Sequence, residues 1–284
     1  MTRVNILSFD IESWFLSYES SQIDISQWSQ MESRIENNLD IILRFLATNN
    51  TIGTFYVLGW IAEQYPEVIK RIADEGHEIG YHSYYHQLPE MQGPLEFEKD
   101  LAKGLELLQK ITGKEIVQYR APRFSFNQNN GWCIPILLKH GITISSSSKS
   151  LRKIGLGKIP QTPFYFEYKA KKILELPLNQ AHSFGLNWVY TGSGYFRVLP
   201  FRLIDHLYKK HEYNMAYFHP RDFDTAVPMT SKLPFYRNIM GRLGNSTTIP
   251  KLSNLMASQR FIPVGEAAGY YLEKSEELSI IKLG

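Results

Sequence analysis

The sequence predicts an α/β protein in which alternating strands and helices form a (β/α) barrel, and three observations support this fold class. Short apolar, β-branched runs recur along the chain and are separated by longer segments with helical periodicity. Such alternation is typical of a parallel sheet covered by helices. About eight strands in a chain of 284 residues favour a barrel of seven to eight parallel strands. We therefore expect a single domain over residues 1–284.

The elements follow in order from the local pattern. The expected strands are Val4–Phe9, Ile52–Val57, Glu78–Tyr81, Glu115–Tyr119, Ile142–Ser145, Lys172–Leu176, Asn214–Phe218 and Phe261–Val264. The expected helices cover Ile35–Leu46, Trp60–Glu75, Leu101–Ile111 and Arg197–His211. Gly76 and Gly113 stand just after two of these helices, where glycine commonly ends a helix.

Three segments do not follow the pattern: Ser13–Gln30, Ser146–Tyr195 and Arg221–Pro250. They are rich in Ser, Gly, Pro and aromatic residues and are too long to be simple connections. We expect them to be loops that elaborate the mouth of the barrel. The serine run Ser145–Ser148 has no neighbouring histidine or glycine-rich turn, so a solvated loop is expected there.

Composition excludes some classes of function. The net charge is +3 without a long Lys/Arg run, so no nucleic-acid partner is indicated. No apolar stretch approaches the roughly 18 residues needed to span a bilayer. Cys133 is the single cysteine and stands between Trp132 and Ile134, which predicts a buried, inert thiol in a reducing compartment. Met1 leads directly into a strand without a signal-peptide pattern, and we expect a cytoplasmic protein.

Polar residues collect where the expected strands end. Asp10 and Glu12 follow the first strand, His82 and His86 the third, Arg120 the fourth and His219 the seventh. In a (β/α) barrel these ends meet at one mouth, where the chemistry of such enzymes takes place. Two histidines four residues apart can share a face on a helical turn or a tight loop and form half of a divalent-metal site, although isolated pairs are commonly surface or core residues. Asp10 and Glu12, two apart on a strand, point to one side and would repel each other without a cation.

Five fragments together carry a family resemblance. They are Ser8-Phe-Asp10-Ile-Glu12, Thr54-Phe-Tyr-Val-Leu-Gly59, Gly76-His-Glu-Ile-Gly-Tyr-His82-Ser-Tyr-Tyr-His86, Tyr119-Arg120-Ala-Pro122 and Tyr217-Phe-His219-Pro. Their order and spacing, from residue 4 to about 265, resemble the NodB-homology polysaccharide deacetylases, which are metal-dependent carbohydrate esterases on a distorted (β/α) barrel. The stretch from Phe235 to Gly244 and the fragment Phe261-Ile-Pro resemble the subgroup found near exopolysaccharide and surface-glycan assembly.

The resemblance implies a role for each site residue. Asp10 would be the general base and Arg120 would orient it and pair with its charge. His82 and His86 would hold a divalent metal, most simply Zn²⁺, and we infer that Glu12 is the third ligand. His219 would be the general acid, and a backbone N–H near Arg123 would help to stabilise the oxyanion.

Two departures from the family pattern matter. The usual motif has adjacent acids after the first strand, whereas Ile11 stands between Asp10 and Glu12 here. The motif that orients the catalytic histidine is not recognisable, and neither Asp222 nor Asp224 can be assigned that role from sequence. Arg123 stands where many relatives have Tyr or Ser, which would place a cation near an acidic or phosphorylated sugar.

The leading hypothesis is a metal-dependent hydrolase that removes N-acetyl groups from an amino sugar of a surface glycan or its precursor. One alternative is a related metal-dependent amidase acting on a small non-sugar C–N bond. The other is a catalytically weakened glycan-binding barrel in which the shift of the acid to Glu12 has cost the metal. A pure binding module has no need for Asp10, Arg120 and His219 together, which favours the enzyme.

Overall fold

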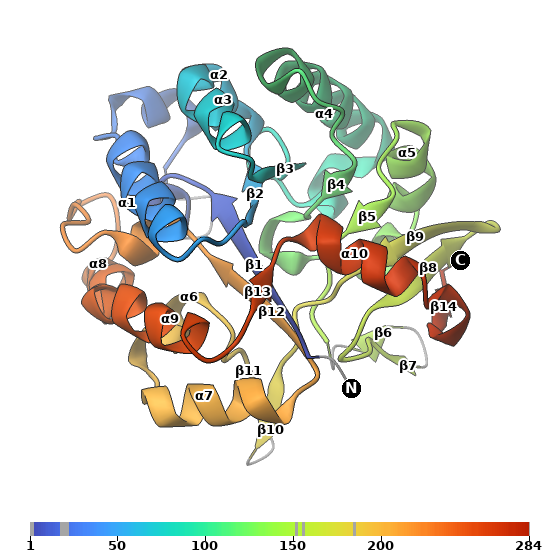
Figure 1. The fold of residues 1–284 in the computed structure, drawn as a ribbon. Helices are drawn as coiled ribbons and strands as arrows, with labels where there is room; N and C mark the ends of the chain where they lie inside the picture. The colour runs from blue at the N-terminus through green and yellow to red at the C-terminus, as the bar shows by residue number, and fades with distance from the viewer. Residues whose placement is uncertain (1–2, 18–22, 151–152, 155–156, 184–185, 284) are drawn as a thin grey trace.

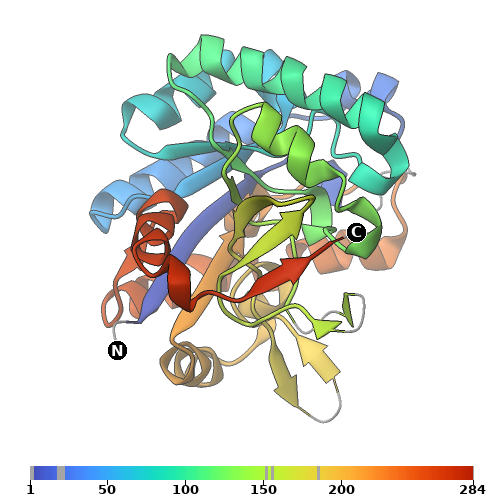
Figure 2. The ribbon, with the colours of Figure 1, turned by 90° about the vertical axis from the view of Figure 1, so that its right-hand side faces the viewer.

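The fold was examined in a computed structural model, which describes residues 3–17, 23–150, 153–154, 157–183 and 186–283. Parts of the predicted mouth loops, at residues 18–22, 151–152, 155–156 and 184–185, lie outside this description. In the described part most of the strands form one curved sheet, and most of the helices surround it (Figures 1 and 2). The sheet has the strand order β12-β1-β2-β3-β4-β5-β9-β8-β14, and β13 pairs with β1. The predicted α/β class is confirmed.

All eight expected strands are present among the described residues. Seven run parallel to one another: β12 (Tyr213–Phe218), β1 (Val4–Ile11), β2 (Thr54–Val57), β3 (Glu78–Tyr81), β4 (Gln118–Tyr119), β5 (Ile144–Ser145) and β9 (Lys171–Glu175). The eighth, β13 (Phe261–Ile262), pairs with β1 beside this run. Beyond β9 lie β8 (Phe164–Tyr168), which is antiparallel to it, and β14 (Ile280–Lys282).

The backbone ladder of the sheet does not close into a complete barrel, because β12 and β14 stand at its two ends. A side chain bridges part of the gap instead. The amide of Asn179 accepts a hydrogen bond from Met215 N at 3.0 Å and donates one to Tyr213 O at 3.0 Å. The Asn179 side chain therefore forms with β12 the two hydrogen bonds that the backbone of a neighbouring strand would form. Asn179 is buried, so these bonds satisfy two backbone groups that water does not reach.

The helices depart from prediction mainly at prolines. The described α-helices are α1 (Ile35–Thr48), α2 (Gly59–Gln64), α3 (Pro66–Asp74), α4 (Pro89–Thr112), α5 (Cys133–Lys139), α6 (Ser193–Val198), α7 (Phe201–Lys210), α8 (Phe235–Arg242), α9 (Thr248–Met256) and α10 (Val264–Leu272). The single helix expected over Trp60–Glu75 is wrong, because Pro66 starts a new helix and its predecessor Tyr65 leaves the helical conformation. Pro200 likewise separates α6 from α7, so Arg197–His211 is not one helix.

The predicted loops also contain short hairpins, and the segment Ser13–Gln30 includes the short helices η1 (Trp14–Ser17) and η2 (Ile25–Gln30). The hairpins are β6 (Lys153–Ile154) with β7 (Gly157–Lys158) and β10 (Ala181–Ser183) with β11 (Leu186–Trp188). The segment Arg221–Pro250, expected to be a loop, in fact contains α8, part of α9 and the turn η6 (Asn245–Thr247), and it overlaps η5 (Pro220–Phe223). Among the described residues no helix is both long and apolar enough to cross a bilayer.

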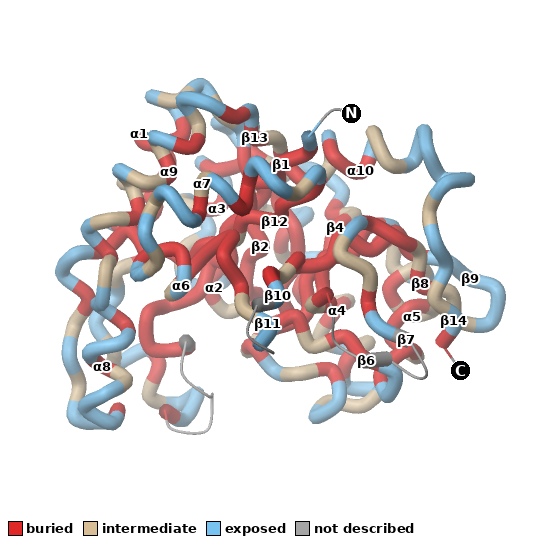
Figure 3. Tube along the Cα trace, turned by 90° about the horizontal axis from the view of Figure 1, so that it is seen from below, coloured by how far each residue is buried: buried red, intermediate tan, exposed pale blue. Residues whose placement is uncertain are grey.

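Alternation along β1 separates the packing face from the site face. Leu7, Phe9 and Ile11 belong to the core that joins the sheet to its helices. Ile6 points the other way and packs in the second core inside the sheet, and Asp10 shares that direction because side chains repeat every two residues. The whole of β1 is buried, and Figure 3 shows the central strands as the buried interior of the molecule. The inner face of the sheet thus leads from an apolar floor to acidic residues at its rim.

Candidate active site

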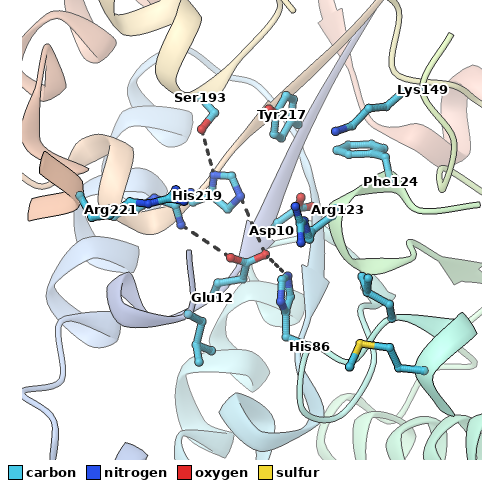
Figure 4. Close-up of a pocket in the computed structure, with 14 residues that line it drawn as sticks. Asp10, Glu12, His86, Arg123, Phe124, Lys149, Ser193, Tyr217, His219 and Arg221 are labelled. Atoms are coloured by element: carbon cyan, nitrogen blue, oxygen red, sulfur yellow. Dashed lines mark hydrogen bonds and ion pairs between the residues drawn. The ribbon is translucent and has the colours of Figure 1, made fainter. Parts of the chain in front are cut away.

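A pocket of about 430 Å³ opens at the carboxyl ends of the parallel strands. Asp10 is the penultimate residue of β1, His82 follows β3, Arg120 follows β4 and His219 follows β12. The predicted convergence of four strand ends is therefore confirmed. The three predicted mouth segments also contribute to the lining, with Leu16, Lys149, Ser193, Arg221 and Arg237. Figure 4 shows Lys149, Ser193 and Arg221 among the side chains that line this pocket.

Glu12, His82 and His86 form a compact set of buried ligand atoms. Glu12 Oε1 lies 3.1 Å from His82 Nε2 and 3.0 Å from His86 Nε2. One ligand atom from each residue lies within 4.8 Å of the others. Two ligands on one Zn²⁺ at tetrahedral angles stand ~3.4 Å apart, so the spacing suits a single cation after a small adjustment. Two imidazoles and a carboxylate are also ligand types that Zn²⁺ commonly takes, and the residues present fit a metal.

A tight loop, not a helix, brings the two histidines together. Ser83 and His86 both have left-handed backbone angles, with φ of 65° and 57°, which are uncommon for residues other than glycine. His82 Nδ1 donates to the carbonyl oxygen of Arg120 at 2.8 Å. This bond fixes the ring and leaves Nε2 directed at Glu12, as metal-binding histidines are usually supported. Of the two arrangements considered for this motif, the loop is confirmed.

The electrostatics of Glu12 suit an ionised ligand. Burial alone would raise the pKa of this carboxyl, but the imidazoles of His86, His219 and His82 outweigh that effect and hold the pKa well below its usual range. Arg221 Nη1 adds a positive charge 3.6 Å from Oε2, and His219 Nε2 lies 3.9 Å from Oε1. Figure 4 shows His86, His219 and Arg221 directed at this one carboxylate.

Asp10 is held by a fully buried arginine. Arg120 Nη1 donates to Asp10 Oδ1 at 2.6 Å. The same guanidinium donates to Ser146 O and Ser146 Oγ and lies between the rings of Tyr56 and Phe124, 4.0 and 4.8 Å from their centroids. If this planar guanidinium moved away from Asp10, its other hydrogen bonds would also be broken. Arg120 therefore orients Asp10 and pairs with its charge.

The serine run beside this pair is buried, contrary to the solvated loop expected from sequence. Ser145, Ser146, Ser147 and Ser148 are all 0% exposed. Ser147 Oγ accepts a hydrogen bond from Ala121 N, and Glu175 accepts bonds from the backbone amides of the last two serines. The serine hydroxyl groups are short and form hydrogen bonds with polar groups at the strand ends beside Arg120. The polar composition of this run predicted exposure to solvent, because the groups that form hydrogen bonds with these serines lie far away in the sequence.

His219 has a buried carboxylate partner that sequence reasoning left unassigned. Asp222 Oδ2 accepts from His219 N at 2.8 Å and lies 3.2 Å from His219 Nδ1. Its other oxygen lies 3.3 Å from Nε of Arg197, and Ser193 Oγ is 3.4 Å from His219 Nδ1. Burial would raise the pKa of Asp222, but His219, Arg197 and Arg221 together lower it well below the usual range. The ionised Asp222 thus fixes the ring so that Nε2 faces the pocket.

Asp224, the other acid considered, has a structural role. It receives two hydrogen bonds from Arg34, at 3.0 and 3.1 Å, and one from Asn38. The turn η5 explains the difference: His219 and Asp222 form a reciprocal cap across Pro220, which points Asp222 back at the histidine. The sequence does contain a signal for the contact between Asp222 and His219. It is an acidic residue three positions after a histidine, in a turn that begins with proline.

A second set, Asp10, Glu12 and His219, also meets the spacing for a metal among the described residues. Asp10 is engaged by Arg120, and His219 by Asp222. The set with His82 and His86 is the better metal site because both rings direct Nε2 at Glu12. Sequence reasoning thus found six residues that the fold brings together. It left Asp222 unassigned and missed Arg197, Ser193 and Arg221.

Comparison with known families divides the chain near its middle. Residues 16–144 match the polysaccharide deacetylase family, and residues 145–268 match a domain of unknown function, DUF3473. The first match contains His82, His86 and Arg120, the second contains His219, and Asp10 and Glu12 precede both. The boundary falls inside β5, and the sheet takes strands from both sides of it. The single-domain expectation stays a prediction.

Curated relatives resemble part of the chain. A peptidoglycan deacetylase from Helicobacter pylori is 31% identical over 139 residues, which is 48% of this chain and 45% of that protein. A peptidoglycan-N-acetylmuramic acid deacetylase from Bacillus subtilis is 36% identical over 88 residues, 31% of this chain and 34% of that protein. The chain therefore spans less than half the length of each of these two relatives.

Solved structures share the fold over nearly the whole chain. A protein described as a polysaccharide deacetylase from Mycobacterium smegmatis superposes with a TM-score of 0.66 at 20% identity, covering 99% of this chain and 93% of that one. A CE4 family pseudoenzyme from Bacillus anthracis superposes with a TM-score of 0.51 at 12% identity, covering 93% and 65%. The fold therefore occurs in a pseudoenzyme as well. The comparisons therefore show a polysaccharide deacetylase match over residues 16–144 and the fold of such proteins over nearly the whole chain.

Proposed function

We propose that this protein is a metal-dependent hydrolase that removes N-acetyl groups from an amino sugar of a surface glycan or its precursor. One observation carries the proposal: two ion-paired groups that can move protons, Asp10 with Arg120 and His219 with Asp222, border the same buried ligand set. A base and an acid beside a metal site are the parts needed for amide hydrolysis. The peptidoglycan and chitooligosaccharide deacetylases among the relatives support the reaction class.

Asp10 is the proposed general base. Its carboxylate borders the pocket and is held in place by Arg120, so it can accept a proton from the attacking water. Arg120 is 0% exposed and has bonds to Ser146 as well. The base therefore keeps one orientation while the proton moves, which is the purpose of such a supporting residue.

His219 is the proposed general acid. Its Nδ1 is engaged by Asp222, and its Nε2 faces the pocket, 3.9 Å from Glu12 Oε1. A proton held at Nε2 can pass to the nitrogen of the departing amino sugar. Asp222 stabilises the positive charge of the imidazolium before that transfer and keeps the ring in place during it.

Glu12, His82 and His86 would hold the cation, with Zn²⁺ as the proposed metal. When bound, it supplies Lewis-acid polarisation of the acetyl carbonyl and makes water more acidic. Glu12 contributes the negative charge of the ligand set, and its burial strengthens that interaction. The N–H of Arg123, where two successive residues have left-handed backbones, is a further proposed donor to the oxyanion.

The pocket lining also favours a substrate with negative charge. It contains four cationic side chains, Arg123, Lys149, Arg221 and Arg237, and two carboxylates. Arg221 faces Glu12, and the other three lie around the sugar-binding space. An acidic or phosphorylated saccharide would complement this charge. Arg123→Asn, which suits the left-handed backbone, should raise KM roughly tenfold for an acidic saccharide and hardly change it for a neutral one.

Acetate release from N-acetylglucosamine oligosaccharides tests the proposed reaction. We expect release to be abolished by a chelator and restored by Zn²⁺. Asp10→Asn should keep the metal and lose turnover, whereas Asp74→Asn, at an exposed surface ion pair, should behave as wild type. Release that persists without any metal would refute the proposal.

The same assay separates the alternatives. A protein that binds the oligosaccharides but never releases acetate would be a glycan-binding barrel, and one that cleaves only small non-sugar amides would be an amidase. A cytoplasmic location stays part of the proposal, supported by the single cysteine, Cys133, whose thiol is fully buried and has its pKa raised by burial. Fractionation of the cells that make the protein would test it.

A further inference from the structure

Helix α8 presents its apolar side chains to solvent and turns Asn238 and Gly241 toward the protein. Phe235, Tyr236, Ile239, Met240 and Leu243, which we call the α8 patch, are 73, 59, 42, 54 and 49% exposed. The Asn238 amide donates to Thr230 O and Leu233 O, so its burial is fully compensated. This is the reverse of an ordinary surface helix, which buries its apolar stripe.

The α8 patch is one continuous stripe with a cation on each side. At 100° per residue, its members span an arc of about 140°. Arg242 falls just beyond one edge of that arc, and Arg237 beyond the other. Figure 3 shows α8 at the periphery of the molecule, with most of its length exposed. An exposed apolar stripe of this size on a soluble fold marks a surface that binds something.

The charge around the patch points to an anionic occupant. From residue 225 to 250 the sequence contains no Asp or Glu, but it contains Lys232, Arg237 and Arg242. The neighbouring stretch from residue 176 to 204 also lacks acids. It includes α6, whose Arg197 donates to Met240 O and Gly241 O and whose Tyr195 and Val198 are exposed.

We propose that α8 docks the protein on an anionic lipid bilayer. Apolar and aromatic side chains would enter the boundary between headgroups and acyl chains, and the flanking arginines would reach the lipid phosphates. A second copy of this chain is the poorer occupant, because a twofold contact would oppose Arg237 and Arg242 to their own equivalents. A bilayer with anionic lipids attracts such basic segments.

The docking helix also reaches the active site. Arg237 belongs to α8 and lines the pocket beside Arg221 and His219. A bilayer under the α8 patch would therefore lie beside the pocket mouth. A glycan carried on a membrane lipid would then reach the pocket of the docked protein directly. This extension to the substrate rests on the proposed deacetylase function. The docking itself does not depend on that function.

Co-sedimentation with vesicles tests the docking. We expect the protein to pellet with vesicles of phosphatidylcholine and phosphatidylglycerol, more weakly at high salt and more weakly with phosphatidylcholine alone. Replacing Phe235 and Ile239 together by Ser should weaken binding roughly tenfold or more. The matched control replaces Leu272 and Ile280 by Ser, which are exposed on α10 and β14 at the other side of the molecule (Figure 1).

Three results would overturn the inference. The first is a wild-type protein that stays in the supernatant. The second is equal loss, or no loss, in the two double variants. The third is a dimer in sedimentation velocity that disappears in the α8 variant while vesicle binding does not change, which would assign the patch to a second copy. Acetate release from a soluble oligosaccharide should survive in both double variants, so failure of docking and failure of the proposed reaction are distinguished.

Discussion

The pair Asp222 and Asp224 allows catalytic positioning to be separated from simple stabilisation. Both are buried and each contacts an arginine, but Asp222 contacts His219 whereas Asp224 contacts Arg34. Changing each aspartate to asparagine keeps the shape and removes the charge. In Asp222→Asn, the amide group must place its NH₂ against Arg197 or against His219 Nδ1. Either orientation opposes two donors and removes the negative charge beside the imidazolium.

The size of the effect follows from the contacts. Two opposite charges about 4 Å apart interact by about 4 kcal/mol at an effective dielectric of 20. Positioned general acids contribute roughly 100-fold to 10,000-fold. We expect Asp222→Asn to lower kcat at least ~100-fold, about 2.7 kcal/mol of barrier, with little change in KM. Both variants should lose about 1.5–3 kcal/mol of unfolding free energy, because each weakens hydrogen bonds to a charged partner.

Steady-state acetate release and urea unfolding measure the two effects independently. Asp224→Asn is the control that matches the stability loss and should retain nearly full kcat. If Asp224→Asn lowers kcat as strongly, or Asp222→Asn stays within about threefold of wild type against the loss expected of a general acid, then Asp222 does not position the acid.

Three further outcomes are expected. Glu12→Gln should lower the metal content measured by mass spectrometry well below that of wild type, and unchanged loading would remove Glu12 from the ligand set. Asn179→Ala should cost about 2–5 kcal/mol in urea unfolding, because it leaves two buried backbone groups without partners, while Asn254→Ala on exposed α9 should cost under 1 kcal/mol. The pKa of Asp224 is lowered, since Arg34 and Asn38 outweigh the effect of burial, so its stabilisation is present above pH ~4 and lost as pH falls further. The urea midpoint of Asp224→Asn should consequently fall less than that of wild type on acidification from about pH 5 to pH 3; an equal fall would contradict this sign.

Much of the fold could be predicted because parallel strands leave a local signal. Each strand is a short apolar run, and β3 (Glu78–Tyr81) has the predicted bounds. The closing contact could not be predicted, because Asn179 pairs with β12 across more than thirty residues of irregular sequence. Pro66 is a signal for the helix break at Tyr65, but the apolar periodicity on both sides predicted one continuous helix.

The candidate site divides in the same way. Strand ends could be predicted from sequence, and this was enough to find Asp10, His82, Arg120 and His219 without knowing which residues they contact. Asp222 needed the geometry of a turn, which sequence alone does not provide. The inverted helix α8 was hidden inside an expected loop, because periodicity reveals an apolar stripe but does not tell which side of it faces the protein.

The position of the family boundary inside β5 has a consequence for the second matched segment. That segment provides His219 and its partner Asp222, but Asp10, Glu12 and both metal-site histidines lie before it. With the roles proposed above, a C-terminal piece that begins at residue 145 would retain the proposed acid without the group it protonates, and the N-terminal piece would retain the proposed metal site without that acid. We therefore propose that the segment matched by a domain of unknown function forms half of one reaction centre in this chain. Its natural assay is complementation: the two pieces should regain acetate release only when mixed.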